Sequence, residues 1–468
     1  MPENKLVDIK LVSDALAVDD NFDIIRRDIV IGGRKAAMFF ADAFIKDEIY
    51  EKMMEYFFRL TPENLEKTPN MQLFSEHYLP YVEIAVSSNL EAITTAVLSG
   101  QTALMIDGIL DALLIDTREY PVRSIEEPEK DRSVRGSRDG FVETLMFNCA
   151  MIRRRIRDVD LRMEHMQIGK STKLDVSLAY MNSLCDKKVL DKIKKGLKSI
   201  NIRGLSMTSQ AVTETIMPTS FFNPFPKVRY TERPDFASAC ILEGKIILLM
   251  DNSPNAMIFE VCFSDFSKES DDFYFSPIVG TYVRLTRIII SILSVVLIPG
   301  VMLLLENPQY IPDWLAFIRM DKTPFVPIFW QFLILEFVID GMRLASLNTP
   351  DSLSSSLGVV AGLLLSEFAV QTEWFTYDTI IYVAFVAIAS YSQPSFEMGY
   401  AMKFSRIFLL IVTRILGIWG FIGGIIAIIV AMGLTKTISG RCYLYPIIPF
   451  NRNDFYKLFI RTKIKNNH

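Results

Sequence analysis

The chain has 468 residues and a formal net charge of −4, and this mildly acidic balance argues against a general nucleic-acid binder. Its length exceeds one ordinary domain. The opening MPENKLVDIK is polar and no apolar run follows it, so we expect no signal peptide and an N-terminal part that stays in the cytoplasm. The five cysteines are widely spaced without a CxxC pair, which favours buried reduced thiols over disulfides or a zinc site.

Residues 1–118 are predicted to form a first cytoplasmic α/β subdomain. A β-hairpin is expected over Phe22 to Phe40, because Gly32-Gly33 suits the positive φ angles of a tight turn. Apolar residues then recur at helical spacing over Lys46 to Leu60. The remaining predicted elements are a helix over Glu91 to Leu98 and strands over Thr102 to Ile106 and Leu110 to Ile115.

Residues 119–165 form a charged segment. Tyr120 to Arg138 mixes both signs and reads as an exposed arm, and a helix is predicted over Phe141 to Glu164. Arginine at this density binds phosphate, anionic lipid or acidic side chains. We favour an intersubunit or interdomain salt-bridge network, with a lipid contact or a solvated face as alternatives. The interface candidates are Arg135, Arg138, Arg153, Arg154, Arg155 and Arg157.

Residues 166–280 repeat the order of the first subdomain. Val97 to Ile115 aligns with Ile241 to Phe259, so that Gly100 falls on Gly244 and the turn aspartates also coincide. We infer a second α/β subdomain that is a diverged copy of the first, with chance similarity of short patterns as the alternative. Its predicted elements are a strand over Leu174 to Leu184, a helix over Lys187 to Leu197, a helix near Ala237 to Leu242, and strands over Ile246 to Met250 and Met257 to Val261.

Residues 281–434 are predicted to be a membrane domain of four to five apolar helical segments, followed by a basic tail over 435–468. Ile288 to Leu305 carries no charge over about the length that crosses a hydrocarbon core of ~30 Å. Lysine and arginine flank both ends of the block, so both termini are expected to be cytoplasmic and the number of crossings even. The other apolar runs are Phe325 to Asp340, Leu357 to Val370, Thr379 to Ser390 and Ile407 to Leu434.

Four ionisable residues lie inside these apolar runs and are candidates for a pore or ion pathway. They are Glu336, Asp340, Glu367 and Arg414. Charges in a membrane segment are costly, and Glu336 and Asp340 share one helix face. Repeated carboxylates in a ring of chains would attract cations. The alternative is a structural role, in which an acid pairs with Arg414 or caps a helix end within one subunit.

Enzyme motifs are weak in this chain. Gly169-Lys170-Ser171-Thr172 resembles the end of a P-loop, but Glu164 stands where a glycine is required. The three histidines form no HExxH pair, and no GxSxG elbow occurs. We therefore predict no catalytic residues, no cofactor and no metal site.

Several segments resemble the signature blocks of the GerA family of spore germination proteins. They are Glu126-Glu127-Pro128, VRGSRDGFVE over Val134 to Glu143, Asn148 to Arg155, and Glu232-Arg233-Pro234-Asp235 followed by LEGKIILLMDNSPNA. Ser137 stands where the family usually has proline. The resemblance covers nearly the full length. Met342 to Leu353 and Ser390 to Ile407 resemble one branch of the family more than the A subunits of nutrient receptors.

The resemblance implies a multi-pass protein of the spore inner membrane that acts in germination. It implies a homo-oligomer in contact with other germination membrane proteins and membrane lipid, and release of monovalent cations. The expected fold is a soluble α/β region of two related subdomains followed by a polytopic α-helical membrane domain. The expected function is a subunit that forms or supports a cation-release channel. The alternative is a non-conducting, membrane-anchored scaffold that organises germinant receptor components.

Overall fold

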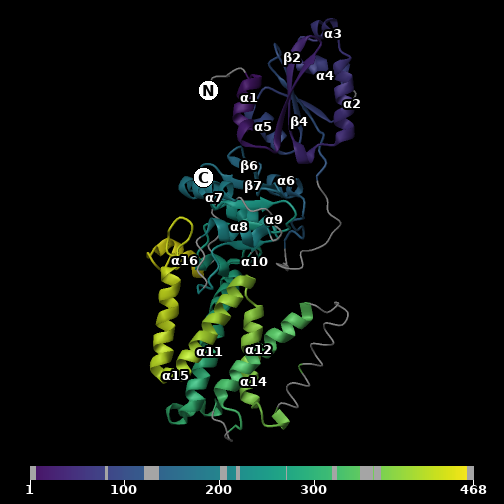
Figure 1. Ribbon diagram of the computed structural model, residues 1–468. Helices are drawn as coiled ribbons and strands as arrows, with labels where there is room; N and C mark the ends of the chain where they lie inside the picture. Colours follow the sequence, from purple (N-terminus) through teal and green to yellow (C-terminus); the bar gives the residue numbers. More distant parts are fainter. Residues whose placement is uncertain are drawn as a thin grey trace. The chain divides into compact units, whose positions relative to one another are not determined.

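The computed structural model describes residues 7–79, 83–120, 136–200, 208–217, 222–269, 271–318, 324–347, 362 and 370–460 (Figure 1). The chain divides into two compact units. The first unit comprises Met1–Pro218 and Val228–Glu260, and the second comprises Thr219–Lys227 and Val261–His468. Each unit has a hydrophobic core of its own.

The first half of the first unit is a three-layer α/β structure. Its five strands form one antiparallel sheet in the order β1-β2-β4-β5-β3. Helices α2 to α4 cover one face of this sheet, and α1 and α5 cover the other (Figure 1). The elements are α1 (Ile9–Leu16), β1 (Ile24–Ile31), β2 (Arg34–Ala41), α2 (Asp47–Phe58), α3 (Pro62–Glu66), α4 (Met71–Tyr78), β3 (Ile84–Ser87), α5 (Leu90–Leu98), β4 (Thr102–Ile106) and β5 (Ala112–Ile115), with 3-10 turns at Val18–Asp20 and Asp42–Phe44.

The second half of the first unit contains a sheet of the same topology. Its strands are also antiparallel and follow the order β6-β7-β9-β10-β8, which is the order of the first sheet element for element. The elements are α6 (Leu145–Arg155), β6 (Leu161–Ile168), β7 (Leu174–Met181), α7 (Lys187–Ser199), α8 (Thr208–Ile216), β8 (Arg229–Thr231), α9 (Pro234–Leu242), β9 (Ile247–Met250) and β10 (Ala256–Ile258).

The two halves agree in local detail where the sequence alignment predicts it. Gly100 and Gly244 both end a helix with positive φ, at +97° and +87°, a conformation that glycine adopts without steric cost. Their amides donate to Val97 and Ile241, each at 2.9 Å. The same strand order and the same helix ends support a common architecture for the two halves.

The predicted helix over Phe141 to Glu164 is wrong in its second half. The helix α6 ends at Arg155, and β6 begins at Leu161 and pairs with β7. Leu161 and Met163 are buried, while Arg162 between them and Glu164 after them are half-exposed, which is the alternation of a strand. The strand was not recognised in the sequence because its outward-facing residues are charged or polar, like those of the helix before it.

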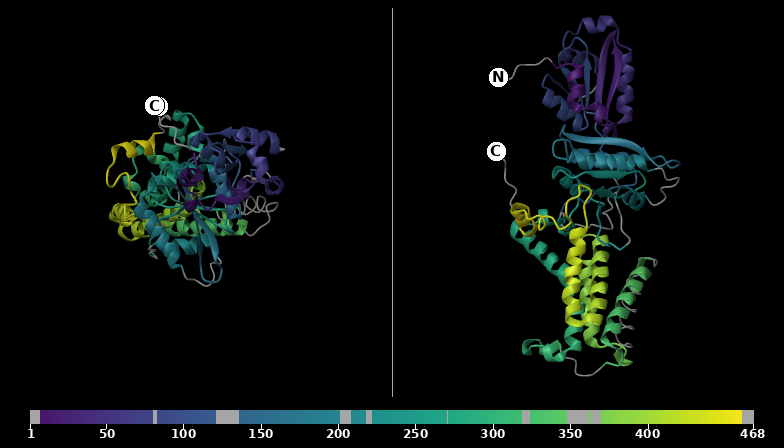
Figure 2. Two further views of the ribbon diagram at one scale, coloured as in Figure 1. Left: turned by 90° about the horizontal axis from the view of Figure 1, so that it is seen from above. Right: turned by 60° about the vertical axis from the view of Figure 1, so that its left-hand side comes forward.

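The second unit is mainly helical. Its core joins residues of four helices, and α11 packs along α15. The two segments of α15, lime and yellow, lie side by side (Figure 2). The elements are a 3-10 turn (Phe263–Ser267), α10 (Asp271–Tyr274), α11 (Pro277–Glu306), 3-10 turns at Pro308–Tyr310 and Asp313–Ile318, α12 (Ile328–Leu347), α14 (Tyr377–Tyr391), α15 (Phe396–Leu434) and α16 (Arg452–Phe459).

Among the described residues, α11 and α15 are the two helices long and apolar enough to cross a membrane. The predicted run over Ile407 to Leu434 is not one continuous helix, because α15 breaks at Gly417, where φ is +58°, and its second segment folds back so that Gly424 lies against Leu409.

α11 begins at Pro277, so the arginines that flank the apolar run over Ile288 to Leu305, Arg284 and Arg287, lie inside the helix and do not precede it. Both are buried and form ion pairs with the fully buried Asp272 of α10, and Arg287 also pairs with Glu269, so two carboxylates compensate the two charges. The predicted run over Leu357 to Val370 lies almost entirely outside the described residues.

Candidate functional site

A buried ion pair connects α12 to α15. The carboxylate of Glu336 accepts two hydrogen bonds from Arg406, from Nε to Oε1 at 2.6 Å and from Nη2 to Oε2 at 2.9 Å. Only 3% of Glu336 and 2% of Arg406 is exposed. Arg406 Nη1 also donates to the carbonyl oxygen of Ser294 in α11, at 2.7 Å. The guanidinium of Arg406 therefore makes a bidentate contact with α12 and a further hydrogen bond to α11, and so links three helices.

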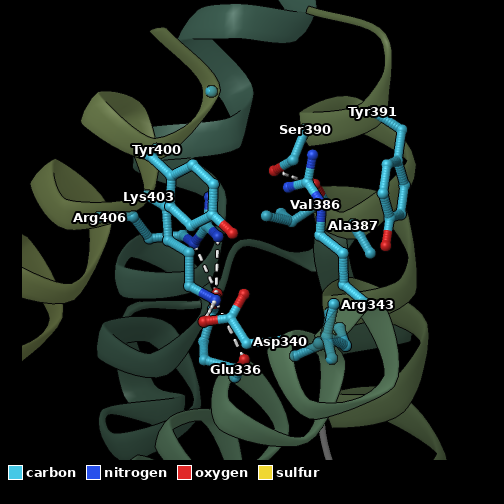
Figure 3. Close-up of a pocket in the computed structure, with 13 residues that line it drawn as sticks. Glu336, Asp340, Arg343, Val386, Ala387, Ser390, Tyr391, Tyr400, Lys403 and Arg406 are labelled. Carbon is cyan, nitrogen blue, oxygen red and sulfur yellow. Dashed lines mark hydrogen bonds and ion pairs between the residues drawn. The ribbon is translucent and has the colours of Figure 1, made fainter. Parts of the chain in front are cut away.

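Lys403 extends the pair into a network, one turn before Arg406 on α15. Its Nζ lies 2.5 Å from Oδ2 of Asp340 and 3.4 Å from Oε2 of Glu336 (Figure 3). Asp340 is the more open acid, since 31% of its side chain is exposed against 4% for Glu336. Two acids and two cations thus compensate one another among apolar helices, where an unpaired charge would be costly.

The network borders a small pocket that is open to its surroundings. Its wall comes from α12, α14 and α15, and it contains Arg343, Tyr391 and Tyr400 as well as the four paired residues (Figure 3). In that figure Arg343 points toward Ser390 on one side of the pocket, and Lys403 contacts Asp340 on the opposite side.

The other pore candidates lie elsewhere. Arg414 is half-exposed and pairs with Glu306 at the end of α11, with Nη1 2.9 Å from Oε1. Glu367 lies outside the described residues. Glu336 does form an ion pair within the subunit, as the predicted alternative requires, but its partner is Arg406 and not Arg414. The missed signal was a lysine and an arginine three residues apart at the start of the last apolar helix.

Of the arginine candidates, Arg153 is the most deeply buried, with 1% exposure. Its Nε and Nη2 lie 2.8 Å and 3.0 Å from the carboxylate of Asp23, which precedes β1. Nη2 also donates to Asn21 Oδ1 at 3.3 Å, and that oxygen accepts from the amide of Met163 in β6. The contact joins the two halves of the first unit.

The neighbouring arginines are less buried. Arg154 lies over the ring of Tyr120, 4.6 Å from its centroid, and Arg155 donates to Asp139 at 2.6 Å. Burial raises the pKa of Asp139, but the hydrogen bonds from Arg155 and a neighbouring serine outweigh burial and hold the pKa below its ordinary value. Arg138 and Arg157 are exposed, and Arg135 lies outside the described residues.

The described part of the chain contains no cluster of three or more His, Cys, Asp or Glu residues that could hold a metal ion. Gly169 lies in the turn between β6 and β7, with φ of +82°. The Gly169 to Thr172 segment therefore closes a hairpin, whereas a P-loop leads from a strand into a helix.

The fold and the charged network define a two-part protein, with an α/β unit of two like halves and a helical unit that contains two long apolar helices. The chain belongs to the GerA family: the model "Bacillus/Clostridium GerA spore germination protein" matches residues 13–468, which confirms the resemblance seen in the motifs.

Individual relatives agree with this membership. The chain is 35% identical over 387 residues to stage V sporulation protein AF of Bacillus subtilis (strain 168). The matched region covers 83% of this chain and 78% of that protein. This relative represents the branch that Met342 to Leu353 and Ser390 to Ile407 resemble. Spore germination protein KA of the same strain is 28% identical over 443 residues, 93% of this chain and 80% of that protein.

Among solved structures, the N-terminal domain of the A subunit of the Bacillus megaterium spore germinant receptor GerK3 is 27% identical. The match has a TM-score of 0.41 and covers 53% of this chain and 92% of that domain.

Proposed function

We propose that this chain is a multi-pass subunit of an oligomeric germination complex in the spore inner membrane, and that it forms or supports a path for cation release. Both termini would lie on the cytoplasmic, core side. Cytoplasmic subdomains over 1–118 and 166–280, a charged arm over 119–165, a membrane domain over 281–434 and a basic tail over 435–468 are part of the proposal. Its partners would be further copies and other germination proteins, and no cofactor or enzymatic activity is proposed.

Family membership and the apolar surface of the second unit support a membrane location. The most apolar window of α15 is only 17% buried, although its mean hydropathy is 2.5. Large side chains such as Ile415 and Trp419 are 72% and 78% exposed. A soluble protein rarely exposes so continuous an apolar face, whereas lipid or neighbouring copies would cover it.

The network of Glu336, Asp340, Lys403 and Arg406 is the observation that carries the ion-path proposal. A helix that only anchors a protein needs no charged side chains, and intramembrane ionisable residues commonly line ion pathways. Asp340 is the acid most open to the pocket, so it is the side chain that a passing cation would meet first. Glu336 could meet a cation only after Arg406 and Lys403 move away from its oxygens.

The test is cation flux in liposomes that contain the full chain, alone and with candidate partner subunits. We expect Asp340→Asn to lower flux, since it removes a negative charge that faces the pocket and leaves the Glu336–Arg406 pair intact. Asp378→Asn, which removes an acid at the start of α14, is the matched control and should conduct normally. Unchanged flux in Asp340→Asn would refute a pathway along this pocket.

The scaffold function is the second candidate. The observation in its favour is that both carboxylate oxygens of Glu336 are already engaged, as a structural tie would require. Folded, oligomeric protein that passes no cations with any partner would support the scaffold and refute the channel.

A further inference from the structure

A second set of side chains, in the pocket and beside it, has no role in the acid network. Arg343 lies near the C-terminal end of α12, Tyr391 is the last residue of α14, and Phe396 and Tyr400 lie in the first two turns of α15. Three helix ends therefore meet here, with the short connection between α14 and α15 beside them. We call these four residues the Arg343 cluster.

Aromatic rings surround the guanidinium of Arg343. Its Cζ lies 4.1 Å from the ring centroid of Phe396 and 5.3 Å from those of Tyr391 and Tyr400. Rings stabilise a guanidinium across its faces, whereas its five N–H donors lie in its plane. Among the residues that the structure describes, none accepts a hydrogen bond from the Arg343 side chain, and none places a carboxylate within ion-pair distance of it. The described residues therefore satisfy its stacking and leave its side-chain N–H donors unused.

The charge balance of the pocket also indicates that Arg343 could bind an anion. Its described wall holds three cations, Arg343, Lys403 and Arg406, and two carboxylates, Glu336 and Asp340. The carboxylates pair with Lys403 and Arg406, so one positive charge remains, and Arg343 carries it. A cation held among apolar helices is stabilised by an anion brought to it, because water screens it poorly there.

We propose that the Arg343 cluster binds the phosphate of an anionic phospholipid headgroup. A planar guanidinium presents two parallel donors that match phosphate oxygens. Helix ends lie at the headgroup level of a bilayer, where tyrosines are also enriched, and basic pockets between helices bind anionic headgroups. Tyr391 and Phe396 are 58% and 48% exposed, so they can also contact the lipid beside the headgroup. The proposal rests on the proposed membrane location but needs no ion conduction.

The experiment is native mass spectrometry of the full chain in an uncharged detergent, titrated with phosphatidylglycerol, phosphatidylcholine or inorganic phosphate. We expect phosphatidylglycerol to bind the wild-type protein best, and Arg343→Gln to weaken that binding roughly tenfold or more. Arg452→Gln removes an exposed arginine of α16 and is the charge-matched control, which should bind normally. Tyr400→Phe keeps the ring beside Arg343 and removes only the hydroxyl, so it should bind nearly as well as wild type.

A structural defect is separated from a binding defect by Arg343→Lys. This variant keeps the charge, but an ammonium lacks the planar fork, so a severalfold loss of lipid binding with a normal size-exclusion profile is expected. Equal lipid binding in wild type and both Arg343 variants would overturn the proposal. So would an equal loss in Arg452→Gln, which would indicate general charge attraction. Inorganic phosphate that binds as tightly as phosphatidylglycerol would assign the cluster to a soluble anion instead.

The result of the lipid-binding test can be distinguished from the result of the cation-flux test. Release of the wild-type chain from membranes by alkaline carbonate would refute the membrane location on which both proposals depend. Loss of flux with lipid binding intact would leave this inference standing.

Discussion

Replacing Arg153 by methionine is expected to destabilise the junction between the two halves of the first unit. Methionine fills much of the same volume but leaves the carboxylate of Asp23, 5% exposed, without its counter-charge. Removing one partner of a buried ion pair costs about 3–5 kcal/mol. Asn21 would also lose a donor, since Arg153 Nη2 now lies 3.3 Å from its Oδ1. The cost should therefore lie within that range and not near zero.

Hydrogen exchange in the full-length protein measures this loss. At about 1.4 kcal/mol per tenfold, amides of β1 and β6 should exchange roughly a hundred- to a few thousandfold faster. Arg162→Met is the control, because its 3.4 Å pair with the mostly exposed Asp20 contributes only about 0–1 kcal/mol. The double variant Asp23→Leu with Arg153→Met should recover much of the loss. Equal effects of Arg153→Met and Arg162→Met would refute the reasoning.

Three further outcomes are expected. Arg406→Met removes both close hydrogen bonds to the buried carboxylate of Glu336 and leaves it only the longer 3.4 Å contact with Lys403. Detergent-solubilised protein should therefore lose about 3 kcal/mol, the lower end of the cost of breaking a buried ion pair, in a thermal or urea unfolding assay; wild-type stability would contradict this. Burial raises the pKa of the Cys149 thiol to about 12, so maleimide at pH 8 should modify it only after denaturation, as peptide mass spectrometry would show. The lowered pKa of Asp139 means that its pairing with Arg155 stabilises the fold above about pH 4 and loses this effect as pH falls through the folded-state pKa. The difference in urea midpoint between wild type and Arg155→Ala should therefore be constant above about pH 5 and shrink in more acidic buffer, and a difference independent of pH would refute it.

Much of the first unit could be predicted because its signals are local. The Gly32-Gly33 turn specifies a hairpin, and β1 and β2 pair on either side of it, with φ of +50° and +80° at the two glycines. The strand over Thr102–Ile106 has the predicted bounds. The repeat was visible because a helix end, a glycine and a strand recur in the same order, and this order depends on neighbours along the chain.

The partners of the charged residues could not be predicted, because they depend on packing between distant segments. Asp23 lies 130 positions from Arg153, and Glu336 lies 70 positions from Arg406. Several cations were available to Glu336 by composition alone. The crossing of α12 and α15 decides which one reaches it, and no sequence period reports that crossing.

The acceptor of Arg153 has a counterpart in the second half of the first unit. Asp23 and Asp160 both stand just before the first strand of their sheet. The carbonyl of each accepts a hydrogen bond at 2.9 Å from the residue that follows the second strand, Asp42 in one half and Asn182 in the other. The two aspartates therefore occupy the same position in the repeat.

Their carboxylates have different uses. Ser183 donates its amide and its hydroxyl to the carboxylate of Asp160, at 2.9 Å and 2.5 Å, whereas Ala43 stands at the matching place in the first half and has no hydroxyl. The carboxylate of Asp23 is thus left for an arginine from the next copy, and that of Asp160 is already occupied. The tandem repeat is therefore asymmetric: the same position accepts an arginine from the next copy in the first half and a serine from its own copy in the second.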